Sequence, residues 1–361
     1  MLKEHVPSPA ASASEQAKKS ANTRRTPLRT RFWQKIVLCV FVRAANLMQR
    51  QSRPSALRLG KQLGLFAYRV DARRRRYAER NLCIAYGEAL PLAERNALIR
   101  HTFQHWGKCT IEFLRSPGLD TNQMDALVST VEGREYLDQV RALGTGFIIV
   151  TGHLGNFEFL GRWLAAQGVP STVVVREPGD PAFSAYIRGM REYKGNVALP
   201  RGTTTARDLL AILRRKAVLT LGIDQNSGDL FVPFFGIPAG TVSGPALLAL
   251  RTGVPLLSAF CVWEPDDTYR IIFLPPLHAE STGDKEADIA RTTTLLTALL
   301  EGVIRRFPDQ WLWLHNRWKA AFEEKNRDRW PEGYDFEEAW AVWERYSFLR
   351  RPAVRPTKPG E

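Results

Sequence analysis

Cysteine is scarce in this chain of 361 residues, and no two cysteines form a C-x-x-C pair. The four copies are Cys39, Cys83, Cys109 and Cys261. Their wide spacing argues against a disulfide framework or a zinc ribbon and fits a reducing compartment. His101, His105 and Cys109 recur at four-residue spacing, which would align them on one helix face. Because no second ligand group accompanies them, a half-buried helix stripe is favoured and no metal site is predicted.

The chain also lacks an apolar run long enough to cross a membrane. A spanning helix needs about 20 apolar residues, whereas the apolar run over residues 36–42 ends at Arg43. Residues 32–44 place aromatic and aliphatic side chains at helical spacing with basic residues on both sides. That pattern indicates either a helix lying in a membrane interface or a helix packed on the domain. Residues 1–30 are rich in Ser, Ala, Pro and Arg and are predicted to be a disordered basic tail.

Acidic residues are outnumbered, with 37 Asp and Glu against 51 Lys and Arg and a net charge of +14. This excess indicates a nucleic acid, an acidic membrane or an acidic protein as partner, or simply a basic surface. The densest basic run is Arg73 to Arg76. A solvated helix face or a contact with acidic lipid explains this run at least as well as nucleic acid does. We therefore expect an anionic membrane surface as a partner and no nucleic acid.

The apolar pattern divides the rest of the chain into a helical, membrane-associated region (31–118), an α/β domain (119–320) and a C-terminal tail (321–361). Within the α/β domain, short apolar strands alternate with helices. Strands are expected at 147–150, 171–175, 196–199, 217–223, 255–262 and 269–274, and helices at 157–167, 181–193, 205–215, 243–250 and 287–307. This alternation predicts an α/β sandwich with a mostly parallel central sheet flanked by helices. Ligands bind such sheets at the carboxyl ends of the strands.

One strand end carries a candidate catalytic pair. The stretch VTGHLGNFEF at 150–159 follows a buried strand and contains His153 and Glu158. Gly152 and Gly155 permit a tight strand-to-helix turn. Asn156 is a candidate N-cap, which places Glu158 in the first turn of the helix, from where it could reach back to His153.

A carboxylate on one imidazole nitrogen fixes the tautomer and makes the other nitrogen a better base. The helix N-terminus adds backbone N–H groups where an oxyanion could form. This layout suits direct attack of an alcohol on a thioester, without an acyl-enzyme. No G-x-S-x-G elbow of a serine hydrolase is present. The alternative is that His153 is only a polar residue at a strand end.

VTGHLGNFEF resembles the signature of the bacterial lipid A biosynthesis (lauroyl/myristoyl) acyltransferase family, and more broadly of the His-x4-Asp/Glu glycerolipid acyltransferases. Two later blocks match that family in order: Asp224-Gln225 with residues 231–255, and WLWLHNRWK at 311–319. The resemblance covers residues 32–319. It implies a glycerolipid-acyltransferase-like fold and a location on the cytoplasmic face of the bacterial inner membrane, where the protein would be peripheral, monotopic or held by a single N-terminal anchor. The acyl chain would move from acyl carrier protein, less often coenzyme A, to a hydroxyl of a lipid A precursor, with no other cofactor.

The resemblance also implies roles for individual residues. His153 would be the general base and Glu158 its orienting partner. Arg191, or secondly Arg188, would hold the donor's phosphopantetheine or the acceptor's phosphate, unless it is only a surface arginine. The resemblance also implies that Asn156 is one of the substrate-binding residues.

Further along the chain, Asp224 and Gln225 would end a strand on the same edge as His153, where they shape the acceptor site or hold a loop. His315 and Arg317, among Trp311, Trp313 and Trp318, either meet lipid headgroups or belong to a packed aromatic block. Residues 234–238 either form an apolar wall for the acyl chain or pack in the core.

One departure from the family pattern keeps other acceptors open. His315-Asn316-Arg317 stands where His-Arg-Arg is more usual, which removes one cation from a possible phosphate contact. Mycobacterial phosphatidylinositol mannoside acyltransferases resemble the family as well, so a phosphatidylinositol mannoside-like acceptor or a lysophospholipid is an alternative. A non-catalytic lipid-binding protein of the same fold is the alternative from another functional class.

Overall fold

The computed structural model describes residues 28–345, which fall into two compact units that divide after Ala44. The predicted basic tail lies outside the described residues except for its last three positions. Helix α2 (Leu28–Arg50) begins in the first unit. On it, Trp33, Val37 and Val40 are 55%, 57% and 61% exposed and share one helical face. None of the described helices is both long and apolar enough to span a membrane.

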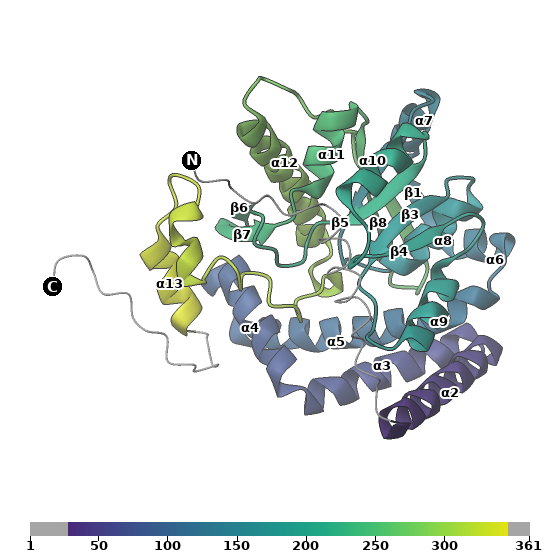
Figure 1. Ribbon diagram of the computed structural model, residues 1–361. Helices are drawn as coiled ribbons and strands as arrows, with labels where there is room; N and C mark the ends of the chain where they lie inside the picture. Colours follow the sequence, from purple (N-terminus) through teal and green to yellow (C-terminus); the bar gives the residue numbers. More distant parts are fainter. Residues whose placement is uncertain (1–27, 346–361) are drawn as a thin grey trace, which may run out of the picture. The chain divides into compact units, whose positions relative to one another are not determined.

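A seven-stranded sheet lies at the centre of the second unit, in the order β1-β9-β8-β2-β5-β3-β4 (Figure 1). The strands are β1 (Val128–Glu132), β2 (Phe147–Thr151), β3 (Ser171–Val175), β4 (Val197–Pro200), β5 (Val218–Gly222), β8 (Leu256–Trp263) and β9 (Tyr269–Phe273). All neighbouring strands pair in parallel except β8 and β9. The prediction of a mostly parallel sheet is confirmed, and the strand expected at 269–274 pairs antiparallel with β8.

Helices flank both faces of the sheet (Figure 1). The helices of the second unit are α3 (Arg53–Val70), α4 (Ala72–Tyr86), α5 (Leu92–Arg115), α6 (Thr121–Ala126), α7 (Arg134–Ala142), α8 (Phe157–Ala166), α9 (Pro181–Arg191), α10 (Ala206–Arg214), α11 (Gly244–Thr252), α12 (Lys285–Arg306) and α13 (Phe336–Arg345). Short 3-10 turns span Gly87–Ala89, Ser116–Gly118, Pro308–Gln310 and Glu324–Arg329.

Strand β2 divides its side chains between two cores. Ile148 and Val150 join the cluster that contains α11 and α12, whereas Phe147 and Ile149 join the cluster that contains α7 and α8. Successive side chains of a strand point to opposite faces, and helices cover both, so every position of β2 is buried. This explains why the sequence shows an unbroken apolar run before His153.

Several elements were not anticipated from the pattern. Strand β1 lies at the sheet edge, and its burial is only intermediate. Strands β6 (Leu230–Phe234) and β7 (Ile237–Thr241) form a separate antiparallel hairpin whose turn, Phe235-Gly236, has φ of 52° and 77°. Helix α13 falls within the predicted C-terminal tail. Its Phe336 and Trp343 belong to the same buried cluster as the sheet, so residues 321–345 are part of the folded unit.

The aromatic residues 234–235 pack in the core. Phe234 is fully buried, with its ring 5.4 Å from Trp311 and 5.5 Å from Trp318. Phe235 is also buried and contacts Trp313. Neither residue lines the cavity at His153. The apolar-wall interpretation of this stretch was therefore wrong, and the core-packing interpretation is confirmed.

Candidate active site

The turn that carries His153 packs tightly against strand β8. Strand β2 ends at Thr151 and α8 begins at Phe157. Between them, Gly155 has φ of +59°, and a Cβ there would lie 1.9 Å from the carbonyl oxygen of Cys261. That same oxygen accepts the backbone N–H of Asn156 at 2.7 Å. Only glycine tolerates both the positive φ and the close approach.

Helix α5 also contacts this turn, through His105 and Cys109. The Gly155 carbonyl oxygen lies 3.2 Å from His105 Nε2 and 3.2 Å from Cys109 Sγ. Burial, assisted by the Lys108 charge, lowers the pKa of His105 to about 3, and burial raises the pKa of Cys109 to about 12. Both groups are therefore neutral near pH 7, and His101 is exposed. The favoured interpretation of this spacing, a half-buried helix stripe, is confirmed.

Asn156 begins helix α8 and is fixed at both ends of its amide. Its Oδ1 accepts the N–H of Phe159 at 3.1 Å, and its Nδ2 donates to the Tyr269 hydroxyl at 2.8 Å. Its exposed fraction is 2%. The predicted N-cap is confirmed. The assignment of Asn156 to substrate binding was wrong, because its amide is buried and has its partners within the fold.

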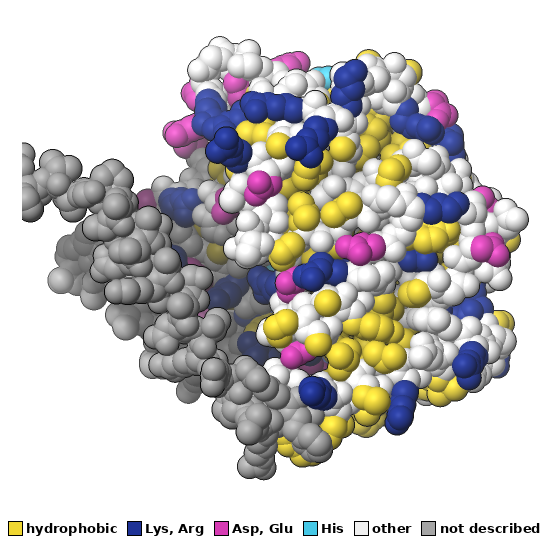
Figure 2. Space-filling model, turned by 45° about the vertical axis from the view of Figure 1, so that its right-hand side comes forward, with side chains coloured by type: hydrophobic (Ala, Val, Ile, Leu, Met, Phe, Trp, Pro, Cys, Tyr) yellow, Lys and Arg dark blue, Asp and Glu magenta, His cyan; other side chains and the backbone are white. Residues whose placement is uncertain are grey.

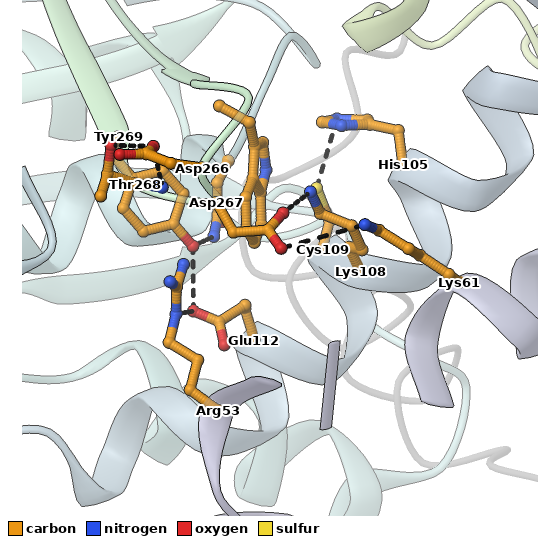
Figure 3. A network of polar contacts seen from close by, with 12 residues as sticks. Arg53, Lys61, His105, Lys108, Cys109, Glu112, Asp266, Asp267, Thr268 and Tyr269 are labelled. Atoms are coloured by element: carbon orange, nitrogen blue, oxygen red, sulfur yellow. Dashed lines mark hydrogen bonds and ion pairs between the residues drawn. The ribbon is translucent and has the colours of Figure 1, made fainter. Parts of the chain in front are cut away.

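Behind Asn156 the network continues to a buried carboxylate, shown in Figure 3. The Tyr269 hydroxyl donates to Glu112 Oε2 at 2.9 Å, and Arg53 Nε donates to the same oxygen at 3.2 Å. The guanidinium of Arg115 lies 3.6 Å from the other oxygen of Glu112. These contacts tie α3, α5 and β9 to the N-cap of α8, so the helix start next to His153 is held by a buried network of hydrogen bonds and ion pairs.

His153 is bound to Asp224 through two hydrogen bonds. Its ring Nδ1 donates to Asp224 Oδ1 at 2.9 Å, and its backbone N–H donates to Oδ2 at 2.6 Å. Trp311 Nε1 also donates to Oδ2, at 2.9 Å. Asp224 can reach His153 because β5 pairs in parallel with β2, with Thr151 opposite Gly222. The prediction that Asp224 and Gln225 lie on the same sheet edge as His153 is confirmed.

The electrostatics of this pair fix the protonation of the imidazole. Burial disfavours the charged ring, but the adjacent Asp224 carboxylate outweighs it and raises the pKa of His153 above 6.5. For Asp224, burial is outweighed by His153 and by the donated hydrogen bonds, which lower its pKa to about 2. Asp224 is therefore ionised and keeps a proton on Nδ1 of His153. Nε2 is then an acceptor in the neutral ring, and Gln225 Nε2 donates to it at 3.2 Å.

Glu158 does not orient the imidazole. Its carboxylate accepts Arg191 Nε at 3.1 and 2.9 Å and Arg191 Nη2 at 2.5 Å. The side chain projects from α8 toward α9, whereas the His153 ring precedes the helix and turns toward β5. The predicted hydrogen-bonding partner was therefore wrong, and Asp224 takes that place. Glu158 still acts on His153 through its charge, which raises the histidine pKa.

The two α9 arginines are both engaged by carboxylates. Arg191 is neutralised by Glu158 and lines the cavity at His153. Arg188 forms an ion pair with Glu177 and is not among the residues that line this cavity. Neither guanidinium is available as a free cation in the structure, so the predicted phosphate-holding role has no support from the geometry.

The late aromatic block is structural. Arg317 has an exposed fraction of 1% and donates to the Gly240 carbonyl and, at 2.6 Å, to Thr241 Oγ1. Burial lowers its pKa to about 10. His315 Nε2 accepts the N–H of Asn226 at 3.0 Å, and burial lowers its pKa to about 4. Trp311, Trp313 and Trp318 are fully buried. The headgroup interpretation was wrong for this block, and the packing interpretation is confirmed.

A cavity of about 380 Å³ opens beside His153. Strands β2, β3 and β5 contribute to its lining, together with α8, α9 and Phe113 of α5. The apolar lining residues are Phe113, Phe157, Val173, Val174, Val175, Met190 and Val242. Gln225 lines the same cavity, so the acceptor nitrogen of His153 and a polar donor face a cavity whose lining is partly apolar and partly charged. The apolar part of the lining is suited to an acyl chain with its reactive end at the imidazole.

Comparison with known proteins identifies the family. Residues 21–320 match the family described as bacterial lipid A biosynthesis acyltransferase. The chain belongs to this family. It is therefore an acyltransferase, as the sequence resemblance implied.

Named relatives of the family differ in acceptor. The lipid A biosynthesis lauroyltransferase of Escherichia coli is 26% identical over 75% of this chain and 87% of its own length. The palmitoleoyltransferase of the same organism is 24% identical over 73% of this chain and 84% of its own length. The phosphatidylinositol mannoside acyltransferase of Mycobacterium tuberculosis is 28% identical over 66% of this chain and 75% of its own length.

Proposed function

We propose that this acyltransferase moves a fatty acyl chain from the thioester of acyl carrier protein or coenzyme A to a hydroxyl of a lipid A precursor or a related glycolipid. The observation that carries the proposal is the orientation of His153. Asp224 holds its Nδ1 proton, and its Nε2 is an acceptor at a cavity that is lined in part by apolar side chains. This is the arrangement that a general base for an alcohol requires.

In the proposed step, the acceptor hydroxyl attacks the thioester carbonyl while Nε2 of His153 takes its proton. A C–O bond forms and a tetrahedral oxyanion develops. The N-terminus of α8 and the Gln225 amide are the candidate donors to that oxyanion, because both lie at the cavity. The intermediate then expels the thiolate as the C–S bond breaks, and the imidazolium returns the proton to sulfur. Asp224 stabilises the imidazolium throughout.

The hydrogen bonds of His153 favour direct transfer over an acyl-enzyme. Within residues 28–345, no serine, threonine or cysteine side chain hydrogen-bonds to this imidazole. The Ser171 hydroxyl, which lines the cavity, instead accepts a hydrogen bond from Thr220 at 2.9 Å. A nucleophile activated by His153 would need to lie within hydrogen-bond reach of it.

The acceptor class follows from the relatives. Two of the three relatives described above are named for lipid A biosynthesis and one for phosphatidylinositol mannoside. A phosphatidylinositol mannoside-like acceptor is therefore the second candidate, supported by the mycobacterial relative at 28% identity. Both are membrane glycolipids with free hydroxyls. A lysophospholipid acceptor or a purely lipid-binding role lacks such support.

We also propose peripheral association with the cytoplasmic face of the bacterial inner membrane. Supporting observations are the exposed apolar face of α2 and a second one on α3, where Leu59, Leu63, Phe66 and Val70 are 41–61% exposed. Lys and Arg side chains are scattered among hydrophobic patches on the face in Figure 2. Apolar side chains beside cations favour an anionic lipid surface.

A flotation assay tests this association. The protein should bind vesicles that contain anionic phospholipid more than vesicles of zwitterionic phospholipid alone. No binding to either kind of vesicle would contradict the proposal.

The test of the acyltransferase reaction uses the purified full chain with a labelled acyl thioester and either a lipid A precursor or a phosphatidylinositol mannoside. Transfer should yield the O-acylated glycolipid, and His153→Ala should abolish it while leaving vesicle binding unchanged. Undiminished transfer by His153→Ala would overturn the mechanism. Free fatty acid as the sole product would show hydrolysis instead of transfer.

A further inference from the structure

Two arginines leave adjacent strands side by side at the mouth of the cavity. Strands β3 and β4 pair with Val175 opposite Pro200, and the next residue on each strand is an arginine. The backbone N–H of Arg201 donates to the Val175 carbonyl at 2.8 Å, which keeps the two chains in register at this point. Arg176 and Arg201 both line the cavity that contains His153, and both residues are exposed.

The charge of this cavity is not balanced by the protein. Its lining includes four arginines but a single carboxylate, Glu158, which is occupied by Arg191. The acidic residue that follows Arg176 in sequence, Glu177, is occupied by Arg188. Within the described part of the chain, no carboxylate forms an ion pair with Arg176 or Arg201. The α9 arginines are thus neutralised. Arg176 and Arg201, which we call the rim pair, have no such partner in residues 28–345 and are open to an external anion.

A buried arginine adds to this imbalance. Arg162 lines the cavity with an exposed fraction of 4%, and Nη1 donates to the Met190 carbonyl at 3.1 Å. Its guanidinium lies 4.2 Å from the centre of the Tyr193 ring, and it has no carboxylate partner among the described residues. Like charges held together destabilise the unliganded site, and an anion that enters relieves this repulsion.

We propose that Arg176 and Arg201 form a subsite for a phosphate group of the substrate that reacts at His153. Planar guanidinium groups match the oxygens of phosphate in paired hydrogen bonds. The inference rests on the proposed function, since it assigns the subsite to a substrate of that reaction. The phosphate has two possible sources: the phosphopantetheine arm of the thioester donor, or a phosphate carried by the glycolipid acceptor.

The test is the double substitution Arg176→Gln with Arg201→Gln, which removes both charges and keeps both side chains polar. Its matched control is Arg214→Gln with Arg215→Gln, an exposed pair at the end of α10 that does not line the cavity. We expect the rim variant to raise KM for the phosphate-bearing substrate by about 10- to 100-fold, with little change in kcat. The control variant should leave both unchanged.

Phosphate-free substrates identify the source. With acyl-pantetheine in place of acyl-coenzyme A, the difference between wild type and rim variant should vanish if the donor phosphate is bound. With a dephosphorylated glycolipid, the difference in KM between wild type and rim variant should vanish if the acceptor phosphate is bound. Unchanged KM values for all substrates, or an equal rise for phosphate-bearing and phosphate-free ones, would overturn the subsite.

Direct binding separates this inference from the proposed reaction. Calorimetry with pyrophosphate should detect binding to wild type and to the control variant and much weaker binding to the rim variant. If wild type transfers no acyl group to any glycolipid but still shows this pattern, the proposed function fails and the anion subsite stands. Equal binding by all three proteins would contradict the subsite.

Discussion

Asp224 binds both the ring and the backbone of His153, although 71 residues separate them in the chain. One oxygen accepts from Nδ1, and the other accepts from the His153 N–H and from Trp311. The carboxylate thus sets the tautomer of the imidazole and the direction in which Nε2 points. Because its exposed fraction is 2%, water cannot readily substitute for either oxygen.

Replacement of Asp224 with asparagine tests this relationship. The amide keeps the shape of the side chain but cannot stabilise an imidazolium, and its NH₂ group accepts no hydrogen bond, so at least one of the present donors to Asp224 loses its acceptor. We expect the acyl-transfer kcat to fall by about 10²- to 10⁴-fold. Asp229→Asn, in the exposed part of the same loop, is the matched control and should retain the wild-type rate. Circular dichroism melting of both variants establishes folding, and near-normal kcat in a folded Asp224→Asn protein would contradict the role.

The pH dependence follows from the direction of the histidine shift. His153 is a base only when its ring is neutral, and its pKa is raised above 6.5. The rate should therefore fall as pH is lowered through a value above 6.5. Glu158 raises this pKa and Arg191 lowers it. Glu158→Gln, which leaves the Arg191 charge unbalanced, should move the acid limb of kcat/KM to lower pH. Superimposable profiles would show that the acid limb belongs to another group.

The sequence predicts His153 and its surroundings well, because the information is local. An apolar run marks a buried strand, glycines mark the turn, and Asn156 caps the next helix. The partner of His153 could not be found in the same way. Glu158 is close in sequence, but the direction of its side chain depends on α9, which supplies Arg191. The parallel β2–β5 pairing that brings Asp224 to His153 joins segments far apart in the chain.

The same limit explains the missed elements. Strand β1 has a mixed apolar and polar sequence because it lies at the sheet edge. The turn Phe235-Gly236 lacks the Asn-Gly or Asp-Gly signal of a short hairpin. Helix α13 is rich in Trp and Glu, a composition that gave no clear boundary, and its burial depends on contacts with Phe322.

Removal of the Tyr269 hydroxyl should weaken the hydrogen-bond network that joins Asn156, the N-cap of α8, to Glu112. Tyr269→Phe leaves the Asn156 amide without an acceptor and Glu112 without one of its donors. Since both groups are buried, we expect the free energy of unfolding to drop by about 1–3 kcal/mol. Urea denaturation measures this change. Tyr334→Phe, in the loop before α13, is a suitable control and should alter stability little; an equal change in both variants would argue against the network.

Gly155→Ala should disrupt the turn that presents His153. The new Cβ would lie 1.9 Å from the Cys261 carbonyl oxygen, and the residue would keep φ of +59° only under strain. Because the neighbouring atom is backbone, β8 and the turn must move apart, and the Asn156 to Cys261 hydrogen bond must stretch. We expect a loss of more than about 2 kcal/mol in unfolding free energy and a large loss of acyl transfer. Gly302→Ala, on an exposed position of α12 with no atom near its Cβ, should instead stabilise by about 0.5–1 kcal/mol. A Gly155→Ala protein with wild-type melting and activity would mean that the turn does not depend on this close approach.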